Sequence, residues 1–216
     1  MKKIGVFGGT FNPIHKGHEK TAKEFYDKFN LCKLLIIPAF IAPHKEIDRG
    51  ILPYQRFEMC KLAFGAEEYK KYNIEVSDIE IKKEGKSYSF NTVTALYDIY
   101  PKEENIIYFL VGTDMFFSVE NWYRYEELLK LCVFTAAYRF DGDDKDTKNK
   151  IFKKRNDLIE RGYKVELLEN SIFEVSSTEL RNKIKKVKTG QPRDLILRQY
   201  LNQDVIEYIN RENLYI

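Results

Sequence analysis

Short apolar runs alternate along the chain with longer segments in which apolar residues recur at helical spacing. Continuous apolar runs predict buried strands, whereas apolar residues repeated every three or four positions predict helices. The predicted strands are residues 4–7, 33–37, 106–111, 133–138 and 164–168. The predicted helices are residues 17–29, 53–64, 89–100, 121–131, 151–161, 178–187 and 205–211. This alternation is typical of a parallel sheet that is covered by helices on both faces.

The segments between these elements carry weaker patterns. Ile74, Val76, Ile79 and Ile81 alternate as in a half-buried, interrupted strand, which a charged turn at residues 82–86 would follow. Residues 38–50 combine prolines and charge without a clear period and predict a functional loop, and residues 141–150 predict a charged surface loop. Pro53 is typical of the first residue of a helix, and Phe57, Cys60, Lys61 and Phe64 then repeat at helical spacing, as expected of one helix face.

The predicted fold class is α/β: a Rossmann-like, doubly wound, mostly parallel sheet with helices on both faces. No repeat or linker divides the chain, so residues 1–216 are expected to form one domain, with a helical C-terminal portion from about residue 178. Ligands of such sheets bind at the carboxyl ends of the strands, near the point where the strand order reverses. Residues 8–18, 38–45 and 112–114 follow three of the predicted strands and should therefore meet in one crevice.

Composition and charge narrow the class of protein. The 216 residues are 44% hydrophobic and 32% charged, which excludes a disordered or fibrous chain. The formal net charge of +3 lacks the basic excess expected of a nucleic-acid-binding protein, so an anionic partner should be small. No signal peptide and no apolar run long enough for a bilayer is evident. Three widely spaced cysteines, Cys32, Cys60 and Cys132, favour a reduced, cytoplasmic setting.

The motif between Gly8 and His18 carries the strongest chemical signal. It reads Gly-Gly-Thr-Phe-Asn-Pro-Ile-His-Lys-Gly-His, and its paired glycines allow the backbone to turn and approach a ligand closely. A helix that begins near His18 directs free amides and its positive dipole end to that place, which favours phosphate. His15 and His18 can both direct ring N–H groups at one anion. The alternatives are a surface turn with incidental histidines or a metal pair, but no carboxylates or cysteines lie nearby to complete a metal site.

The motif resembles the signature of nucleotidyltransferases with a His-x-Gly-His motif, and four later blocks narrow the resemblance. These blocks are Pro-Ala-Phe-Ile-Ala-Pro-His-Lys at 38–45, Ser-Tyr-Ser-Phe-Asn-Thr at 87–92, Gly-Thr-Asp at 112–114 with Trp122 following, and Ser-Ser-Thr-Glu-Leu-Arg at 176–181. In this order, over about the first 185 residues, they resemble bacterial nicotinate-nucleotide adenylyltransferase. The resemblance implies that ATP and nicotinate mononucleotide (NaMN) are joined to give nicotinate adenine dinucleotide (NaAD) and pyrophosphate, in NAD biosynthesis.

The resemblance implies an ATP site and a set of catalytic residues. The implied ATP-binding residues are Gly8, Gly9, Thr10, Phe11, His15, His18, His44, Lys45, Ser176, Ser177, Thr178 and Arg181. The implied catalytic residues among them are His15, His18, Lys45 and Arg181, and Mg²⁺ is expected to be bound with ATP. Read from the residues alone, His44 and Lys45 would be two cations on an exposed loop. Ser176-x-x-Glu179 is likewise a capping box with Val175 and Leu180 as its hydrophobic staple, which is compatible with anion binding.

A second implied set of residues binds the nicotinate nucleotide: Tyr88, Thr92, Gly112, Asp114, Trp122 and Tyr123. The resemblance implies that Trp122 stacks on the pyridine ring, that Thr92 contacts the pyridine carboxylate and that Asp114 accepts hydrogen bonds from ribose hydroxyls. Without it, a lone tryptophan is more often a core residue, and Asp114 could be a helix cap after the strand.

Three positions depart from the family pattern. Asn12 stands where the family usually has Asp, Ala42 precedes Pro43 where two prolines are frequent, and Ser89 stands where Thr is common. Asn keeps a turn-forming side chain but removes a negative charge near the expected phosphates. Other adenylyltransferases, acting on nicotinamide mononucleotide (NMN) or phosphopantetheine, and a non-catalytic nucleotide sensor remain as alternatives. The presence of His15, His18, Lys45 and Arg181 argues against the sensor. The oligomeric state is not evident from the sequence.

Overall fold

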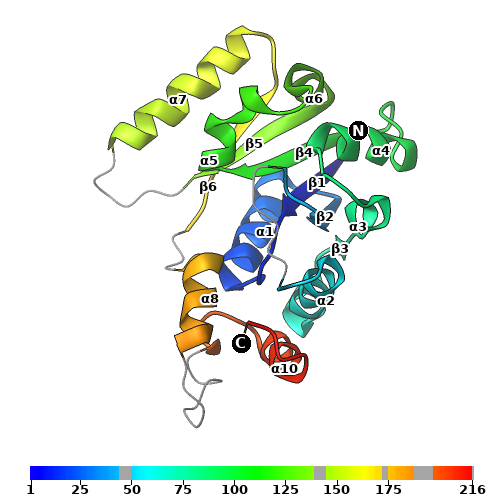
Figure 1. The fold of residues 1–216 in the computed structure, drawn as a ribbon. Helices are drawn as coiled ribbons and strands as arrows, with labels where there is room; N and C mark the ends of the chain where they lie inside the picture. The colour runs from blue at the N-terminus through cyan, green and yellow to red at the C-terminus, as the bar shows by residue number, and fades with distance from the viewer. Residues whose placement is uncertain (44–49, 139–144, 172–174, 187–196, 216) are drawn as a thin grey trace.

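The computed structural model describes residues 1–43, 50–138, 145–171, 175–186 and 197–215 (Figure 1). Its strands are β1 Lys2–Gly9, β2 Lys33–Pro38, β3 Ile74–Val76, β4 Asn105–Gly112, β5 Cys132–Tyr138 and β6 Val165–Glu169. Its α-helices are α1 Lys16–Phe29, α2 Pro53–Phe64, α3 Ile79–Lys83, α4 Ser89–Ile99, α5 Thr113–Phe117, α6 Tyr125–Leu131, α7 Lys145–Glu160, α8 Ser177–Lys186 and α10 Gln203–Arg211. Two short 3-10 helices are η1 Glu67–Tyr69 and η2 Val119–Asn121.

The described strands form one sheet in the order β3-β2-β1-β4-β5-β6. Every neighbouring pair is parallel, including β1 with β2 on one side and with β4 on the other. The strand order therefore reverses between β1 and β4, which is the place where doubly wound sheets bind ligands. The predicted Rossmann-like α/β fold class is confirmed.

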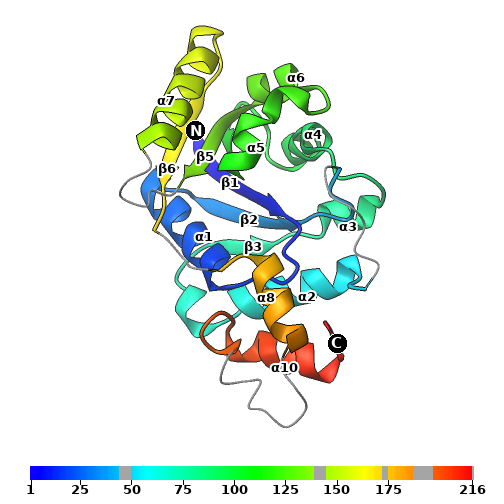
Figure 2. The same ribbon diagram turned by 60° about the vertical axis from the view of Figure 1, so that its left-hand side comes forward.

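Alternating side chains of each strand enter two separate cores. In β2, Leu34 and Ile36 pack into a core covered by α1, α2, α8 and α10. Leu35 and Ile37 face the opposite core, covered by α4, α5, α6 and α7. Figures 1 and 2 show these two groups of helices on the two sides of the sheet. Apolar residues on both faces explain why the strands read as continuous apolar runs rather than as alternating patterns.

The predicted strand over residues 74–81 is wrong in its second half. β3 ends at Val76, and Ile79 and Ile81 lie in the short helix α3, which ends at Lys83 inside the predicted charged turn. In Ile-Glu-Ile-Lys-Lys, the alternation of only two apolar residues is too short to distinguish a strand from one helical turn. The helical geometry places Glu80, which a strand would have directed away from the isoleucines, in a half-buried position beside them.

Other element boundaries also differ from the predictions. The predicted helix 121–131 is interrupted, since η2 ends at Asn121 and α6 begins at Tyr125, after Arg124 with a positive φ of 53°. Helix α5 was not predicted, and α7 begins at Lys145, within the predicted surface loop. The buried face of α2 includes Cys60 and Phe64 of the predicted set, but its other members are Arg56, Met59 and Ala63 instead of Phe57 and Lys61. Lys61 is exposed, so the prediction placed the helix face one position too far along the chain.

The C-terminal helices pack into the α1 side of the molecule. Leu197, Leu201, Val205 and Ile209 are buried in the core that also contains α1 and α2. Both views show α8 and α10 side by side at one end of the molecule (Figures 1 and 2).

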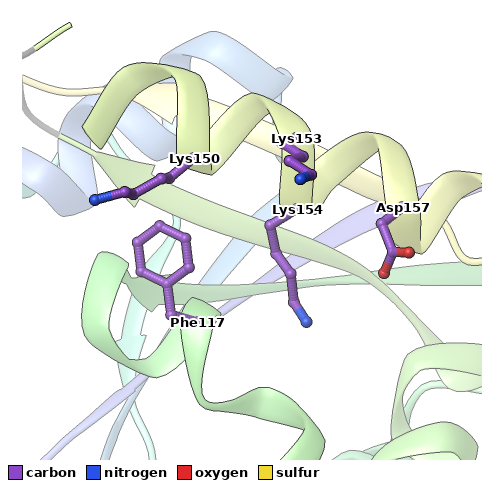
Figure 3. A pocket seen from close by; sticks show the side chains of 5 residues that line it. All are labelled: Phe117, Lys150, Lys153, Lys154 and Asp157. Atoms are coloured by element: carbon purple, nitrogen blue, oxygen red, sulfur yellow. The ribbon is translucent and has the colours of Figure 1, made fainter. Parts of the chain in front are cut away.

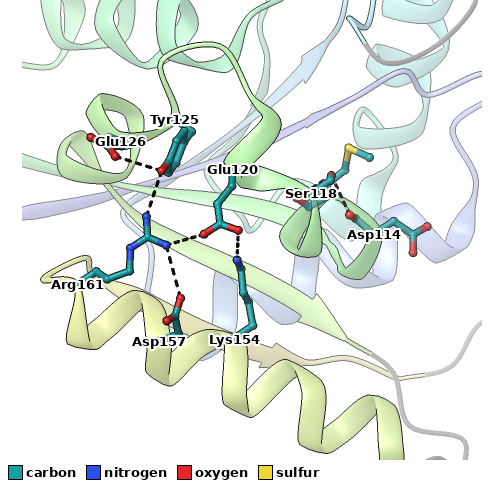
Figure 4. Close-up of polar contacts among 9 residues, drawn as sticks. Asp114, Ser118, Glu120, Tyr125, Glu126, Lys154, Asp157 and Arg161 are labelled. Carbon is teal, nitrogen blue, oxygen red and sulfur yellow. Dashed lines mark hydrogen bonds and ion pairs between the residues drawn. The ribbon is translucent and has the colours of Figure 1, made fainter.

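On the opposite face of the sheet, Glu120 in η2 forms ion pairs with Lys154 and Arg161 (Figure 4). The N–O distance is 2.5 Å in each pair. These pairs hold α7 and the residue after it against the segment between α5 and α6. Among the described helices, none is both long and apolar enough to cross a bilayer.

Candidate active site

A cavity of about 1170 Å³ opens at the carboxyl ends of β1 and β4, where the strand order reverses. Its walls come from the turn after β1, the segment after β2, the β4–α5 junction and the start of α8. Among the sequence-predicted site residues, its lining includes Gly8, Gly9, Thr10, Phe11, His15, His18, Gly112, Asp114, Ser176, Ser177, Thr178 and Arg181. We call this space the central cavity.

The two glycines of the first motif serve different purposes in the turn. A Cβ on Gly9 would meet the ring of Phe11 at 2.9 Å, so packing of Phe11 excludes a side chain there. A Cβ on Gly8 would meet only the carbonyl oxygen of Ile37 at 3.9 Å and would otherwise project into open space. Gly8 therefore leaves the backbone accessible to a ligand, while Gly9 allows the chain to fold over itself. Phe11 adopts a positive φ of 48°, and the Asn12–Pro13 peptide bond is cis.

His15 and His18 lie together at the start of α1, with ring centroids 3.8 Å apart. The backbone N–H of His15 donates to Nδ1 of His18 at 3.3 Å. In a neutral imidazole with Nδ1 as acceptor, Nε2 carries the proton, so His18 presents an N–H donor on its other side. Phe11 packs edge-on to His18 at 5.2 Å between centroids, which restricts the imidazole further. The pair can therefore present ring N–H groups to one anion in the central cavity.

The backbone amides at the start of α1 are less available than the sequence suggested. The N–H of Lys16 donates to the carbonyl of Tyr200 at 2.8 Å, and the N–H of His18 donates to that of His15 at 2.8 Å. The expected cluster of free amides is thus wrong for these two positions, because the C-terminal segment and the first helical turn already use them. Side chains and the glycine turn remain as the donors for an anion.

The start of α8 is joined directly to the first motif. Ser176 and Glu179 form the predicted capping box: the Ser176 N–H donates to the Glu179 carboxylate at 2.7 Å, and the Glu179 N–H donates to Ser176 Oγ at 3.2 Å. The Ser177 hydroxyl donates to the carbonyl of Pro13 at 3.0 Å. Arg181 donates from Nη1 to the carbonyl of Asn12 at 2.7 Å and from Nη2 to Thr178 at 3.1 Å. Two motifs more than 160 residues apart therefore form one wall.

Arg56 is a site residue that the sequence analysis missed. It is 4% exposed on α2, and it donates to the carbonyl of Thr10 at 2.7 Å and to that of Phe40 at 3.0 Å. It thereby fixes the segments that follow β1 and β2 against each other at the cavity wall. The sequence did contain a signal, because Arg56 lies three positions before Met59 and therefore shares the buried face of α2. The predicted face was displaced by one position and left Arg56 out.

Asp114 lies in the first turn of α5 and is exposed to the central cavity. The helix begins after Gly112, so Asp114 is not its N-cap, and the alternative of a simple cap residue is wrong. Figure 4 shows its carboxylate directed away from the Glu120 network. Among the described residues that line the cavity, Asp114 is the only carboxylate.

Tyr88, Thr92, Trp122 and Tyr123 lie outside the described lining of the central cavity. The rings of Tyr88 and Tyr123 are 4.8 Å apart, and Tyr123 is half exposed. Trp122 is partly buried and packs edge-on against Phe134 at 6.1 Å, in the manner expected of a core residue. Thr92 is buried and donates from its hydroxyl to Glu80 at 2.6 Å. Stacking on a pyridine ring and contact with its carboxylate stay predictions for these residues.

Two predicted site residues, His44 and Lys45, lie outside the described residues. Within the described ranges, no three His, Cys, Asp or Glu side chains gather closely enough to hold a metal ion.

A smaller cavity of about 410 Å³ lies between α5 and α7, lined by Phe117, Lys150, Lys153, Lys154 and Asp157 (Figure 3). It contains none of the residues that the sequence singled out. Since Lys154 is paired with Glu120, the positive charge of this cavity is already partly neutralised.

Comparisons with known proteins agree with this geometry. Residues 6–183 match the model of the Cytidylyltransferase-like family. A Fusobacterium nucleatum protein with the name "Probable nicotinate-nucleotide adenylyltransferase" is 38% identical over 183 residues, covering 85% of this chain and 88% of that protein. A Clostridium botulinum protein of the same name is 33% identical over 215 residues and 100% of both chains. Among solved structures, Plasmodium falciparum nicotinic acid mononucleotide adenylyltransferase complexed with NaAD has the same fold, with a TM-score of 0.75 at 20% identity over 100% of this chain and 98% of that one.

Proposed function

The chain belongs to the nicotinate-nucleotide adenylyltransferases of the Cytidylyltransferase-like family, and we propose that it transfers the adenylyl group of ATP to NaMN. The products are NaAD and pyrophosphate, and the reaction is a step of NAD biosynthesis. The observation that carries the proposal is the wall of the central cavity, where the His15–His18 pair and Arg181 meet at one turn.

In the proposed reaction, a phosphate oxygen of NaMN attacks the α-phosphorus of ATP. A new phosphoanhydride bond forms while the bond between the α-phosphorus and the oxygen that bridges to the β-phosphate breaks, and pyrophosphate leaves with the electron pair. This transfer needs no covalent intermediate on the protein. Positioning of the two substrates and stabilisation of negative charge supply the catalysis expected for phosphoryl transfer.

We assign the charge stabilisation to His15, His18 and Arg181. The Nε2–H of His18 donates to a phosphate oxygen of ATP, and its orientation is set by the His15 backbone N–H on Nδ1. Arg181 is held by Asn12 and Thr178, and its guanidinium offers further N–H donors toward the cavity. Residues 38–45 resemble a block of the family, and on this basis we propose that His44 and Lys45 complete the set of phosphate-binding cations.

Mg²⁺ is proposed to enter as part of the substrate Mg-ATP. Mg²⁺ usually keeps several waters and is held by substrate phosphates with one or two carboxylates, and Asp114 is placed in the cavity wall. Asp114 is also proposed to accept hydrogen bonds from ribose hydroxyls. We place the reaction in the cytoplasm, because Cys32, Cys60 and Cys132 are all free thiols.

The proposal is tested by measuring pyrophosphate release from Mg-ATP with NaMN, NMN and phosphopantetheine supplied separately. We expect rapid release with NaMN and much slower release with the other two acceptors. Equal rates with NaMN and NMN would keep the chemistry and refute the acid preference. Tight ATP binding without release for any acceptor would favour a nucleotide sensor.

A further inference from the structure

The pairing of β1 with β2 ends where both segments reach the central cavity. Gly9 pairs with Pro38 in the last step of the parallel register, and the N–H of Ala39 donates to the carbonyl of Gly9 at 2.9 Å. Thr10 and Phe40 are the next residues along the two segments, and both line the cavity. Their carbonyls lie beyond the strand pairing, so their hydrogen bonds must come from another part of the chain.

The guanidinium of Arg56 supplies a donor to each of these carbonyls. Nη1 donates to the carbonyl of Thr10 at 2.7 Å, and Nη2 donates to that of Phe40 at 3.0 Å. Because both N–H groups belong to one planar fork, they fix the two carbonyls relative to each other. Arg56 is itself part of the cavity lining. The side chain therefore continues the connection between β1 and β2 beyond the last strand pair, at the wall of the cavity.

The bridge is anchored from both sides. Met59 and Cys60 share the buried face of α2 with Arg56, and both are fully buried in the core that α1 also enters. The N–H of Phe40 donates to Oγ of Ser87 at 2.9 Å, so both polar groups of Phe40 are bound. Displacement of either cavity segment would break a hydrogen bond to a charged group, which is stronger than one between neutral groups.

We propose that Arg56 is a positioning residue for ATP, because it holds the turn of residues 8–11 in the place where the triphosphate binds. The proposal rests on the proposed function, in which this turn belongs to the ATP site. For stability alone, an apolar side chain of similar size often serves as well as a buried charge. An apolar side chain cannot hold two carbonyls at a fixed spacing, which accounts for an arginine at this buried position.

The first test compares the steady-state kinetics of the unaltered chain with those of Arg56→Met and Arg56→Lys. Methionine removes the charge and the fork, whereas lysine keeps the charge and loses the fork. We expect the KM for ATP to rise about tenfold in both variants, the order of magnitude of one lost hydrogen bond to a charged group. The KM for NaMN should stay within about threefold. Lys61→Gln, at an exposed lysine of the same helix, is the matched control and should equal the unaltered protein.

Chemical rescue separates positioning from a merely structural role. Arg56→Ala leaves space at the wall of the central cavity, where an added guanidinium ion can donate to the carbonyls of Thr10 and Phe40. We expect about 20 mM guanidinium, far below denaturing concentrations, to lower the raised KM for ATP of this variant. Methylammonium at the same concentration carries the charge without the planar fork and should not lower it. Circular dichroism confirms that each variant is folded.

A KM for ATP within about twofold of the unaltered value in folded Arg56→Met would overturn the proposal. Equal rises in the KM for ATP and for NaMN, or an unchanged KM for ATP in Arg56→Lys, would also overturn it. The same holds for equal effects of guanidinium and methylammonium on Arg56→Ala. If the methionine and alanine variants do not fold, Arg56→Lys gives the decision. Failure of the proposed function would look different, because the unaltered chain would then form no dinucleotide from ATP and NaMN.

Discussion

The hydroxyl of Tyr215 donates a 2.6 Å hydrogen bond to Oδ1 of Asn12, across 203 positions of the sequence. Tyr215 is buried, and the carbonyl of the same Asn12 receives Arg181 at 2.7 Å. The turn between β1 and α1 is therefore fixed from the C-terminal end of the chain and from α8. It also gives a physical role to the side-chain oxygen of Asn12, a position where the family usually has Asp.

Replacing this tyrosine should loosen the first motif. Tyr215→Phe removes one buried hydrogen bond, and we expect the free energy of unfolding to fall by about 1–3 kcal/mol. The measurement is denaturant-induced unfolding monitored by circular dichroism. Tyr54→Phe, at an exposed tyrosine of α2, is the control and should change little. Equal stabilities of the two variants would show that the Tyr215 contact contributes nothing.

His18→Ala removes the proposed phosphate donor, together with the edge contact that the His18 ring makes with Phe11. Loss of one such donor typically lowers turnover by about 10²-fold or more, and we expect a decrease of that order in kcat. Steady-state pyrophosphate release measures it, and circular dichroism confirms that the variant is folded. Near-normal turnover of folded His18→Ala would refute the assigned role.

Arg181→Lys keeps the charge but loses the planar fork that reaches Asn12 and Thr178 together. We expect kcat/KM for ATP to decrease by about tenfold, because lysine cannot reproduce the two-branched geometry. Lys185→Gln removes a charge from the exposed face of the same helix and serves as the control. If Lys185→Gln lowers kcat/KM for ATP as much as Arg181→Lys does, general positive charge rather than the fork would explain the effect.

Glu19 should make the stability of the protein depend on pH. Burial raises the pKa of Glu19 from 4.5 to about 7, outweighing the hydrogen bond from Tyr69, which lowers it. Between these two pH values the folded protein keeps a proton that the unfolded chain has lost, so stability falls as pH rises. Ionisation of Glu19 should therefore lower the free energy of unfolding by about 3 kcal/mol between pH values below 4.5 and pH values well above 7.

The measurement is the free energy of unfolding between pH 4.5 and 8 for the unaltered protein and Glu19→Gln. Glutamine cannot ionise, so its variant should lose this part of the slope and be the more stable of the two above pH 7. Glu103→Gln, at an exposed glutamate, is the control and should keep the pH dependence of the unaltered protein. Parallel curves for the unaltered protein and Glu19→Gln would contradict the prediction.

The sheet was largely predictable because its strands are apolar on both faces. A short run of branched apolar residues such as Leu34–Leu35–Ile36–Ile37 is typical of a parallel strand that is buried on both faces, and β2 is such a strand. The histidine pair was predictable too, since both members lie within one turn of the motif. Short elements were not, because a five-residue segment such as Ile79–Lys83 spans little more than one helical turn, which is too short for its apolar residues to show a repeat.

Contacts between distant segments escaped the sequence analysis for a different reason. Nothing near Arg56 in the sequence indicates that its partners are the carbonyls of Thr10 and Phe40. Backbone carbonyls carry no sequence signature, and only the folded sheet brings them to α2. The same holds for Tyr200, whose carbonyl takes the α1 amide that was expected to bind phosphate.

The central claim is that the chain moves an adenylyl group to the acid form of the pyridine nucleotide. The most direct test supplies ATP labelled at the α-phosphate, with Mg²⁺ and equal concentrations of NaMN and NMN, and identifies the labelled product. We predict that nearly all transferred label appears in NaAD and that the released pyrophosphate is unlabelled. Equal labelling of both dinucleotides, or no labelled dinucleotide at all, would contradict the claim.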